Sequence, residues 1–569
     1  MGPIRKTVAG MLGAMAIVSP AVQASRPNII FILVDDVGAG WIPPYAERLA
    51  PDDIEPEIAD IYVKNRTGWL SSGNERPMPM DAPERTVQYS VDREKHLQAA
   101  RTCMPTLSKM SRDGAVFKNC FATAALCAPS RAGLLTGTFP QRWGAYWNMD
   151  IDHYGVPVDR TVIAEPLAET GYRCGIIGKW HIAKKDPALL EQAWSELGGA
   201  DEISPERRDE VKQYAIEKLA YYTSSNPPQH PLSRGFDYYF GYNCHEDRFY
   251  NSETLWENFS RVPKRPEGEF LTDLFNKKSC EFIQRSLAEE YPFFLYYAPM
   301  SMHGPLLPPP SHYSSRFDTG IPFSNAYAGH LFALDQGIEM MMDILKRAGQ
   351  LENTLFVFSA DNGGTVFHVP PHNAPNRGGK GTAWLGGINV PLIVSQPGTV
   401  KPGFYEDIVS LADLMPTVAA AAGAAVPSDI DGKSLLPFLR GDKAAGPRDS
   451  LVSCGIHSSH WSYFYEGCGD INYRDGRMSP MYAWVLKDND LFLQITPLHP
   501  GIMDSLPGGL PARTMLYDLS GDRQQRRNLY DQFPERAKAL QKQIRQWLSG
   551  MEEPLTSQKE EYHLLRKEL

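Results

Sequence analysis

The chain carries four short, uninterrupted apolar runs, and polar residues follow each of them at once. The runs cover residues 28–34, 172–177, 293–298 and 355–359. Unbroken runs rich in β-branched and aromatic residues are typical of strands buried on both faces of a parallel sheet. Helical patterns lie between them at residues 104–112, 162–169, 274–288 and 326–348. This alternation predicts a large α/β domain over residues 25–440.

The polar residues that follow the four predicted strands form a chemically coherent set. They are Asp35, Asp36, Lys179, His181, His303, Asp361 and Asn362. Because ligands bind at the carboxyl ends of parallel strands, we expect these side chains to lie close together. Carboxylate and amide oxygens are hard donors, and they suit Ca²⁺ or Mg²⁺ better than zinc. Taken alone, each pair is more often a loop cap than a set of metal ligands, and only the two pairs together on one sheet favour a metal site.

Outside this core, the pattern predicts two insertions and a smaller second domain. Residues 41–100 and 184–230 interrupt the α/β alternation, either as lids and specificity loops or as surface decoration. Short strands at residues 483–487, 491–495 and 515–518 precede an amphipathic helix at 534–548. We therefore expect a C-terminal α+β domain over residues 441–569, with an antiparallel sheet and a C-terminal helix. The charged tail after residue 550 is expected to be solvated.

The N-terminus has the pattern of a secretory signal peptide. A basic start is followed by an apolar stretch at residues 8–18 and a small-residue cleavage pattern that ends at Ala24. The alternative is a membrane anchor, but the stretch is shorter than the ~20 residues that span a bilayer. We expect residues 1–24 to direct export to the periplasm or the medium, or to a lysosome or the medium in a eukaryote, without a stable membrane anchor.

Composition narrows the class of protein further. Hydrophobic residues make up 42% and charged residues 22% of the 569 residues, as in ordinary globular enzymes. The net charge of −10 disfavours binding to nucleic acid. Eight cysteines are too few for a disulfide-built scaffold. Cys454 and Cys468 are one candidate pair in a loop-rich region.

The most informative stretch is Cys127-Ala-Pro-Ser-Arg131-Ala-Gly-Leu-Leu-Thr-Gly137. Proline favours the first turn of a helix, so Pro129 places Cys127 at a helix N-terminus, which suits a bound anion. The thiol there is a candidate nucleophile, and the alternative is an inert buried cysteine. The run resembles the sulfatase signature, C-x-P-S-R followed by x-x-L-L-T-G, at every defined position.

A second stretch, residues 171–181, resembles the second sulfatase signature. Cys174 stands where the family usually has Ser or Thr, and we expect only a packing change there. Leu385 stands where sulfatases commonly carry an acidic residue before Gly386-Gly387, so a carboxylate near Lys380 is missing. The resemblance implies an alkaline phosphatase-like fold: a large mixed, mostly parallel sheet sandwiched by helices, with the smaller domain after it.

The resemblance also implies a specific chemistry. In sulfatases a separate maturation enzyme oxidises the signature cysteine to formylglycine (3-oxoalanine). The hydrated aldehyde attacks sulfur through one hydroxyl, and loss of the second hydroxyl's proton then expels sulfate. Covalent catalysis of this kind divides one difficult step into two easier ones. Cys127 is the residue that this would modify.

Residue by residue, the resemblance implies the following roles. Asp35, Asp36, Asp361 and Asn362, completed by residue 127, match the ligands of one metal ion, taken to be Ca²⁺. Arg131 and Lys179 match the groups that hold formylglycine and its charge. His181 matches the residue that helps the second hydroxyl lose its proton. His303 and Lys380 match the groups near the leaving oxygen, and the sequence does not rank them as proton donor.

Substrate-binding residues are predicted only from their place in loops near these motifs. The candidates are His153, His245, Asp247, Arg248, His372, Arg377 and Trp384. Sugar sites combine such polar groups with an aromatic platform. An exported sulfatase with two long insertions resembles enzymes that act on sulfated polysaccharides, and the sugar, the sulfated position and the oligomeric state stay open.

Two other functions compete with this prediction. A phosphodiester or phosphonate ester hydrolase of the same superfamily could use formylglycine, although phosphatases there usually carry Ser or Thr and a two-zinc ligand set. A catalytically inactive, sugar-binding relative is the second alternative. The nearly complete set of polar residues argues against it.

Overall fold

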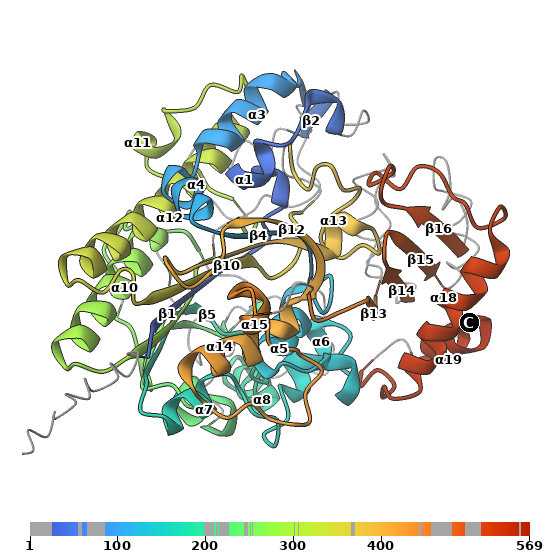
Figure 1. Cartoon of the computed structure of the whole chain (residues 1–569). Helices are drawn as coiled ribbons and strands as arrows, with labels where there is room; N and C mark the ends of the chain where they lie inside the picture. The colour runs from blue at the N-terminus through green and yellow to red at the C-terminus, as the bar shows by residue number, and fades with distance from the viewer. Residues whose placement is uncertain are drawn as a thin grey trace, which may run out of the picture.

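A computed structural model gives the architecture of most of the chain (Figure 1). The structure describes residues 26–54, 60–64, 86–198, 210–211, 214–215, 227–243, 248–250, 252, 254–263, 265–300, 302–304, 306–365, 370–442, 446–456, 481–495, 514–556 and 559–569. The predicted signal peptide, Cys468, His245 and Asp247 lie outside the described residues. Within them, no helix is long and apolar enough to cross a membrane.

A ten-stranded mixed sheet forms the centre of the molecule (Figure 1). In spatial order its strands are β12 (Gly403–Ser410), β4 (Gly114–Phe121), β11 (Asn389–Ser395), β10 (Thr354–Ala360), β1 (Asn28–Val34), β9 (Phe293–Ala298), β5 (Arg173–Lys179), β6 (Tyr238–Tyr242), β7 (Trp256–Glu257) and β8 (Ser260–Arg261). The neighbours β10, β1, β9, β5 and β6 run parallel, and antiparallel pairs flank them. The predicted sheet and its four central strands are confirmed.

Helices cover both faces of this sheet, as Figure 1 shows. The helices α3 (Arg93–Thr102), α4 (Pro105–Arg112), α10 (Leu271–Ala288) and α12 (Pro322–Arg347) lie on one side, and α5 (Cys127–Thr136), α7 (Ala164–Glu169) and α14 (Leu414–Ala422) on the other. Smaller helices are α1 (Pro43–Ala46), α6 (Asn148–Tyr154), α8 (Pro187–Glu196), α11 (Ser311–Ser314), α13 (Leu385–Ile388) and α15 (Leu436–Leu439). Every residue of β1 is buried, which explains its continuous apolar sequence.

A separate antiparallel sheet follows in the C-terminal part of the chain (Figure 1). Its strands are β13 (Ser450–Ile456), β14 (Met481–Lys487), β15 (Asp490–Ile495) and β16 (Thr514–Asp518). Helix α18 (Pro534–Leu548) packs against it through Leu540, Ile544 and Leu548, which are buried. The predicted smaller antiparallel domain is therefore present.

The chain after residue 550 differs from the prediction of a solvated tail. It forms α19 (Lys559–Glu568), which buries Tyr562 and Leu565 against the smaller sheet. These residues lie three positions apart on one face of the helix, and the charged residues that flank them made the apolar stripe hard to recognise in the sequence. The tail is therefore a packed element of the fold.

The segment 41–100 also contains more regular structure than its sequence indicated. Strands β2 (Asp60–Lys64) and β3 (Thr86–Ser90) form an antiparallel pair, and α3 ends the segment. Asp92 caps α3 by accepting a hydrogen bond from the backbone N–H of Lys95 at 3.0 Å. Expectations about the rest of this segment fall on residues that the structure does not describe.

Candidate active site

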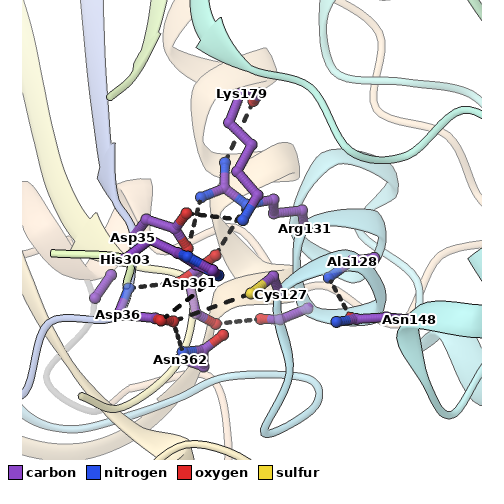
Figure 2. A network of polar contacts seen from close by, with 12 residues as sticks. Asp35, Asp36, Cys127, Ala128, Arg131, Asn148, Lys179, His303, Asp361 and Asn362 are labelled. Atoms are coloured by element: carbon purple, nitrogen blue, oxygen red, sulfur yellow. Dashed lines mark hydrogen bonds and ion pairs between the residues drawn. The ribbon is translucent and has the colours of Figure 1, made fainter. Parts of the chain in front are cut away.

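The carboxyl ends of the central strands bring the predicted residues together. Val34 of β1 and Ala360 of β10 are partners in the parallel register, so Asp35 and Asp361 leave the sheet side by side. The backbone N–H of Asp36 donates to Asp361 Oδ1 at 3.3 Å. Figure 2 shows these side chains pointing toward one centre with Asn362 and Cys127. The prediction that the polar residues after β1 and β10 lie close together is confirmed.

Helix α5 delivers Cys127 to the same centre. Because β11 runs antiparallel to both β10 and β4, β4 points in the direction of β10 and ends at the same edge. Cys127 is the first residue of α5, as the position of Pro129 predicted. Gly133 lets α5 approach Thr123 closely, since a Cβ atom on it would lie 2.2 Å from the Thr123 Oγ1 atom. The helix ends at Gly137, whose φ of 66° is left-handed.

Three buried cations pair with the carboxylates around Cys127. Arg131 Nε donates to Asp361 Oδ2 at 2.9 Å, and its Nη2 lies 3.5 Å from Asp35 Oδ1. Lys179 Nζ donates to Asp35 Oδ2 at 2.7 Å. These side chains have no exposed surface. Buried charges of this kind are stable only when they are paired, and here each has an opposite charge in contact.

Lys380 completes the cationic set from a loop after β10. Its Nζ donates to the Asp36 carboxylate at 2.8 Å. Its backbone N–H donates to the carbonyl of Gly364, and that of Gly381 donates to the carbonyl of Ala125, two residues before Cys127. The loop is therefore fixed both to the end of β10 and to the start of α5.

The two predicted histidines occupy different sides of the cluster. His303 Nε2 lies 3.8 Å from Asp36 Oδ2. Burial, reinforced by the charge of Lys380, lowers the pKa of His303 to about 4. His181 Nε2 lies 3.6 Å from Asp152 Oδ1, and burial holds the pKa of His181 well below its ordinary value. Both imidazoles are therefore uncharged at neutral pH.

The oxygen donors fit a divalent cation. Ligand atoms of Asp35, Cys127 and Asp361 all lie within 4.8 Å of one another. Within the described part of the chain, the buried Asp35 Oδ1 and Asn362 Oδ1 atoms have no hydrogen-bond partner. The Asn362 amide group is oriented by its Nδ2, which donates to Asp36 Oδ1 at 2.8 Å. Buried oxygens without hydrogen-bond partners, beside further carboxylates, are suitable ligands for a hard cation such as Ca²⁺.

Electrostatics support the same conclusion. The buried cluster contains three carboxylates and three cations: Asp35, Asp36, Asp361, Arg131, Lys179 and Lys380. Burial raises the pKa of Asp361 to about 7, and Asp35 adds to the shift. Burial opposes ionisation of Asp35 as well, but Lys179 and Arg131 hold its pKa well below the usual range. The formal charges cancel, so a bound divalent cation would leave the cluster with a net charge of +2, which suits an anionic ligand.

The Cys127 thiol does not have the properties expected of an unmodified nucleophile. Cys127 is fully buried, and burial raises its pKa to about 12 although Lys179 and Lys380 act in the opposite direction. A thiol with such a pKa is protonated at neutral pH, and the thiol form is a poor nucleophile. The burial of Cys127 therefore disfavours the interpretation of the unmodified residue as a reactive thiol.

The predicted substrate residues are placed less uniformly. His153 on α6 and Arg248 are exposed. His372 is buried, and its backbone carbonyl accepts a hydrogen bond from the N–H of Gly40. Trp384 is only 3% exposed and packs with Tyr517, and the Arg377 guanidinium lies 4.2 Å from its ring centroid. This burial differs from the exposed aromatic platform that we expected of Trp384.

Three polar residues near the site were not predicted from the sequence. Asn148 Oδ1 accepts from the backbone N–H of Ala128 at 3.0 Å, beside Cys127 (Figure 2). Asp152 faces His181 and also accepts from Lys185 Nζ at 2.5 Å. Asn148 and Asp152 are four residues apart on one short helix, a spacing that places both on one face. That spacing was the only signal in the sequence.

The Lys380 loop is supported by the smaller domain instead of the missing carboxylate. Gln525 Oε1 accepts from the backbone N–H of Leu385 at 2.8 Å. Arg523 is half-buried and donates to the side-chain oxygens of Asn376, Asn119 and Asn389 at 2.9–3.0 Å. Arg523, which lies in the turn after β16, thus connects the loop that carries Asn376 to β4 and β11. Gln525 thus holds the backbone of Leu385, at the position where the sulfatase pattern has an acidic residue.

Comparison with known proteins identifies the family that this fold and site define. A Sulfatase profile matches residues 27–424, which is most of the chain. The chain belongs to the sulfatase family, and it is an enzyme that hydrolyses sulfuric esters.

Two curated relatives show how far the similarity extends. The chain is 27% identical to the uncharacterized sulfatase YdeN of Escherichia coli K12 over 562 residues, which cover 96% of this chain and 89% of the relative. It is 30% identical to N-acetylgalactosamine-6-sulfatase of Mus musculus over 365 residues, which cover 59% of this chain and 61% of the relative.

Solved structures share the fold. Ps i-CgsB in complex with k-i-k-neocarrahexaose aligns with a TM-score of 0.65 and 20% identity, covering 95% of this chain and 97% of that one. The phosphonate monoester hydrolase SpPMH of Silicibacter pomeroyi aligns with a TM-score of 0.51 and 17% identity, and the alignment covers 93% of this chain and 97% of that one. At these identities the likeness concerns the fold, which is common to sulfate and phosphonate ester hydrolases.

Proposed function

We propose that the protein hydrolyses sulfate esters of a polysaccharide or oligosaccharide, with formylglycine made from Cys127 and one Ca²⁺ ion. The observation that carries the proposal is the fully buried cluster in which Asp35, Asp361, Arg131 and Lys179 surround the first residue of α5. Burial raises the pKa of the Cys127 thiol to about 12, which disfavours the unmodified thiol as the nucleophile and supports a modified residue 127. Formylglycine, when present, supplies a hydroxyl nucleophile activated by the metal ion.

The chain's own residues would then divide the work. Asp35, Asp36, Asp361 and Asn362, with residue 127, would hold the ion. Arg131 and Lys179 would compensate the negative charge that develops beside residue 127. His181 would accept a proton, and His303 and Lys380 would deliver a proton or positive charge to the leaving oxygen.

A sulfated carbohydrate is the substrate class that the relatives favour. One relative is by name an N-acetylgalactosamine-6-sulfatase, and one structural neighbour was solved with k-i-k-neocarrahexaose. Exposed polar residues such as His153 and Arg248, together with His372 and Arg377, are our candidates for contacting the sugar. The undescribed His245 and Asp247 stay candidates on sequence grounds.

The first experiment is the mass of the tryptic peptide over residues 119–131, from protein produced with a formylglycine-forming maturation enzyme. We expect residue 127 to have lost its sulfur and gained an aldehyde oxygen, and fragmentation distinguishes it from Cys120 in the same peptide. A peptide that keeps both thiols under these conditions would contradict the proposed chemistry.

The second experiment separates the competing functions. The wild type should release inorganic sulfate from sulfated oligosaccharides, and Cys127→Ala should lose turnover by about 10⁴-fold or more while still binding the sugar. Cys120→Ala is the matched control, since its side chain is also buried but lies in β4. Turnover of phosphonate or phosphate diesters alone would favour the hydrolase alternative. An inactive, fully matured wild type that still binds sugar would favour the sugar-binding alternative.

Removal of the metal ion provides a third prediction. Treatment with EDTA should abolish sulfate release, and Ca²⁺ should restore it more fully than Zn²⁺, because the donors are carboxylate and amide oxygens. Calorimetry should detect one Ca²⁺ per chain in the wild type and weakened binding in Asn362→Leu. Restoration by Zn²⁺ alone would contradict the calcium assignment.

The location and partners of the protein follow from the same proposal. We propose that residues 1–24 direct export to the periplasm or the medium, and that the maturation enzyme meets the chain before it folds. The division near residue 440 into a catalytic and a smaller domain is likewise a proposal. Mass spectrometry of secreted protein should find residue 25 at the N-terminus.

A further inference from the structure

Helix α6 touches the candidate active site at two points. It begins at Asn148, whose Oδ1 accepts from the backbone N–H of Ala128 at 3.0 Å. One helical turn later, Asp152 Oδ1 lies 3.6 Å from His181 Nε2. Residues four apart share a helix face, so a single face of α6 holds both the start of α5 and His181.

The Asp152 carboxylate is buried and has a dedicated counter-charge. Its Oδ2 accepts from Lys185 Nζ at 2.5 Å, and its backbone carbonyl accepts from the N–H of Lys185 at 2.7 Å. The side chains of both residues are about nine-tenths buried, with 11% and 8% exposed. Burial opposes ionisation, but His181 and Lys185 hold the pKa of Asp152 well below its ordinary range. Asp152 is therefore a fixed anion beside His181.

His181 itself is held in an unusual backbone conformation. It follows β5 with a φ of 54°, in the left-handed region that non-glycine residues seldom adopt. Its side chain is 1% exposed. A neutral imidazole carries its proton on one ring nitrogen and a lone pair on the other, and the neighbours of the ring select between the two tautomers.

We propose that Asp152 is the positioning residue of His181, which it holds in the tautomer that carries the proton on Nε2. Nδ1 is then the nitrogen with the lone pair, and it forms the new N–H bond when a hydroxyl group gives up its proton and its oxygen keeps the electron pair. The imidazolium so formed directs its Nε2–H at the Asp152 carboxylate, while Lys185 keeps that carboxylate in place. The assignment of His181 as proton acceptor rests on the proposed function; the tautomer does not.

The first test reads the tautomer directly in protein whose Cys127 is unmodified. Nitrogen NMR of ¹⁵N-histidine-labelled protein should show His181, assigned by its loss in His181→Gln, with the proton on Nε2. In Asp152→Asn this preference should weaken or reverse. A wild-type proton on Nδ1, or the same tautomer preference in Asp152→Asn, would overturn the proposal whether or not the protein is a sulfatase.

The second test uses matured enzyme and a matched carboxylate. Asp152→Asn should lower kcat by about 10–100-fold, a loss smaller than the ~10²–10⁴-fold that a general base supplies, with KM within about twofold. Asp150→Asn is the control, because Asp150 lies on the same helix but accepts from Tyr146, Trp147 and Thr556. It should lower the melting temperature and reduce kcat far less than Asp152→Asn does.

The outcomes separate the two proposals. Equal kcat values for Asp152→Asn and the wild type would show that Asp152 only tethers α6 to Lys185, and would overturn the positioning role. If matured wild-type protein releases no sulfate from any sulfated oligosaccharide, the proposed function fails, whereas the NMR result still decides whether Asp152 sets the tautomer of His181.

Discussion

At the scale of single residues, Arg131 does more than balance charge. Its guanidinium donates to Asp361 through Nε, approaches Asp35 through Nη2 and donates to the Lys179 carbonyl at 3.3 Å through Nη1. The planar fork of arginine suits three acceptors in fixed directions, which a lysine ammonium could not contact together. This geometry explains why the motif requires arginine four residues after Cys127.

Replacing Arg131 should therefore be costly even in the absence of substrate. Arg131→Met leaves the buried Asp361 without its ion-pair partner and Asp35 with Lys179 alone, and we expect a loss of about 3–5 kcal/mol in the free energy of unfolding. Arg173→Met is the control, since its pair with Glu289 at 2.6 Å is more than one third exposed and should contribute less than ~1 kcal/mol. The midpoints of urea unfolding, compared with that of the wild type, measure the loss of stability in each variant. Equal shifts for the two variants would contradict this account of the cluster.

Residue patterns predicted the centre of the site but not its surroundings. Asp35, Asp361 and His303 follow buried strands, so strand periodicity alone placed them at one edge. Asp152 and Gln525 come from a seven-residue helix and from a turn after β16, and no periodic pattern marks either. Their contacts depend on packing between distant segments, which one sequence does not reveal.

At the scale of elements, one helix fixes the start of another. Asp335 on α12 accepts from the backbone N–H groups of Thr106 and Leu107, both at 2.9 Å, in the first turn of α4. Asp335 is fully buried, and burial raises its pKa to about 6 despite these hydrogen bonds. Two of the helices that cover one face of the large sheet, α4 and α12, are thus joined by a carboxyl group that titrates in mildly acidic solution.

This carboxyl group predicts a pH dependence of stability with a definite sign. Between its ordinary pKa and about 6, the folded state keeps the proton that the unfolded state has lost, so stability falls as pH rises. The contribution is on the order of 3 kcal/mol. The stability of the wild type relative to Asp335→Asn should decrease from pH 4 to pH 6 in thermal unfolding. Asp318→Asn, whose carboxyl is 85% exposed, should parallel the wild type.

At the scale of the whole molecule, the end of the chain supports the helix that carries Asn148 and Asp152. Leu555 donates to the carbonyl of Gly144 at 3.0 Å, and Thr556 Oγ1 donates to Asp150 Oδ1 at 2.6 Å. Tyr562 of α19 packs on Tyr146 with ring centroids 5.8 Å apart. The C-terminal residues thus brace α6, although the sequence after residue 550 predicted no packed structure.

Substitutions and deletions in these C-terminal residues should therefore lower the stability of the whole fold. Tyr562→Ala removes a side chain that is 1% exposed and should cost about 3 kcal/mol or more. His563→Ala, at the next position with a side chain 66% exposed, should change stability by less than ~0.5 kcal/mol. Deletion of residues 551–569 should lower both the melting temperature and kcat. A truncated protein with unchanged kcat would show that α6 holds its place alone.

The order of strands in the large sheet has a consequence for timing. The strand that leads into Cys127, β4, pairs only with β11 and β12 among the described strands, and these are made about 260 residues after Arg131. At roughly 5–20 residues per second, synthesis of that length takes roughly 13–50 seconds. Throughout this interval the Cys127 segment has no sheet partner, so its thiol is open to another protein. If a maturation enzyme oxidises Cys127, as we propose, its access would be limited to this interval and would end when β11 and β12 pair with β4.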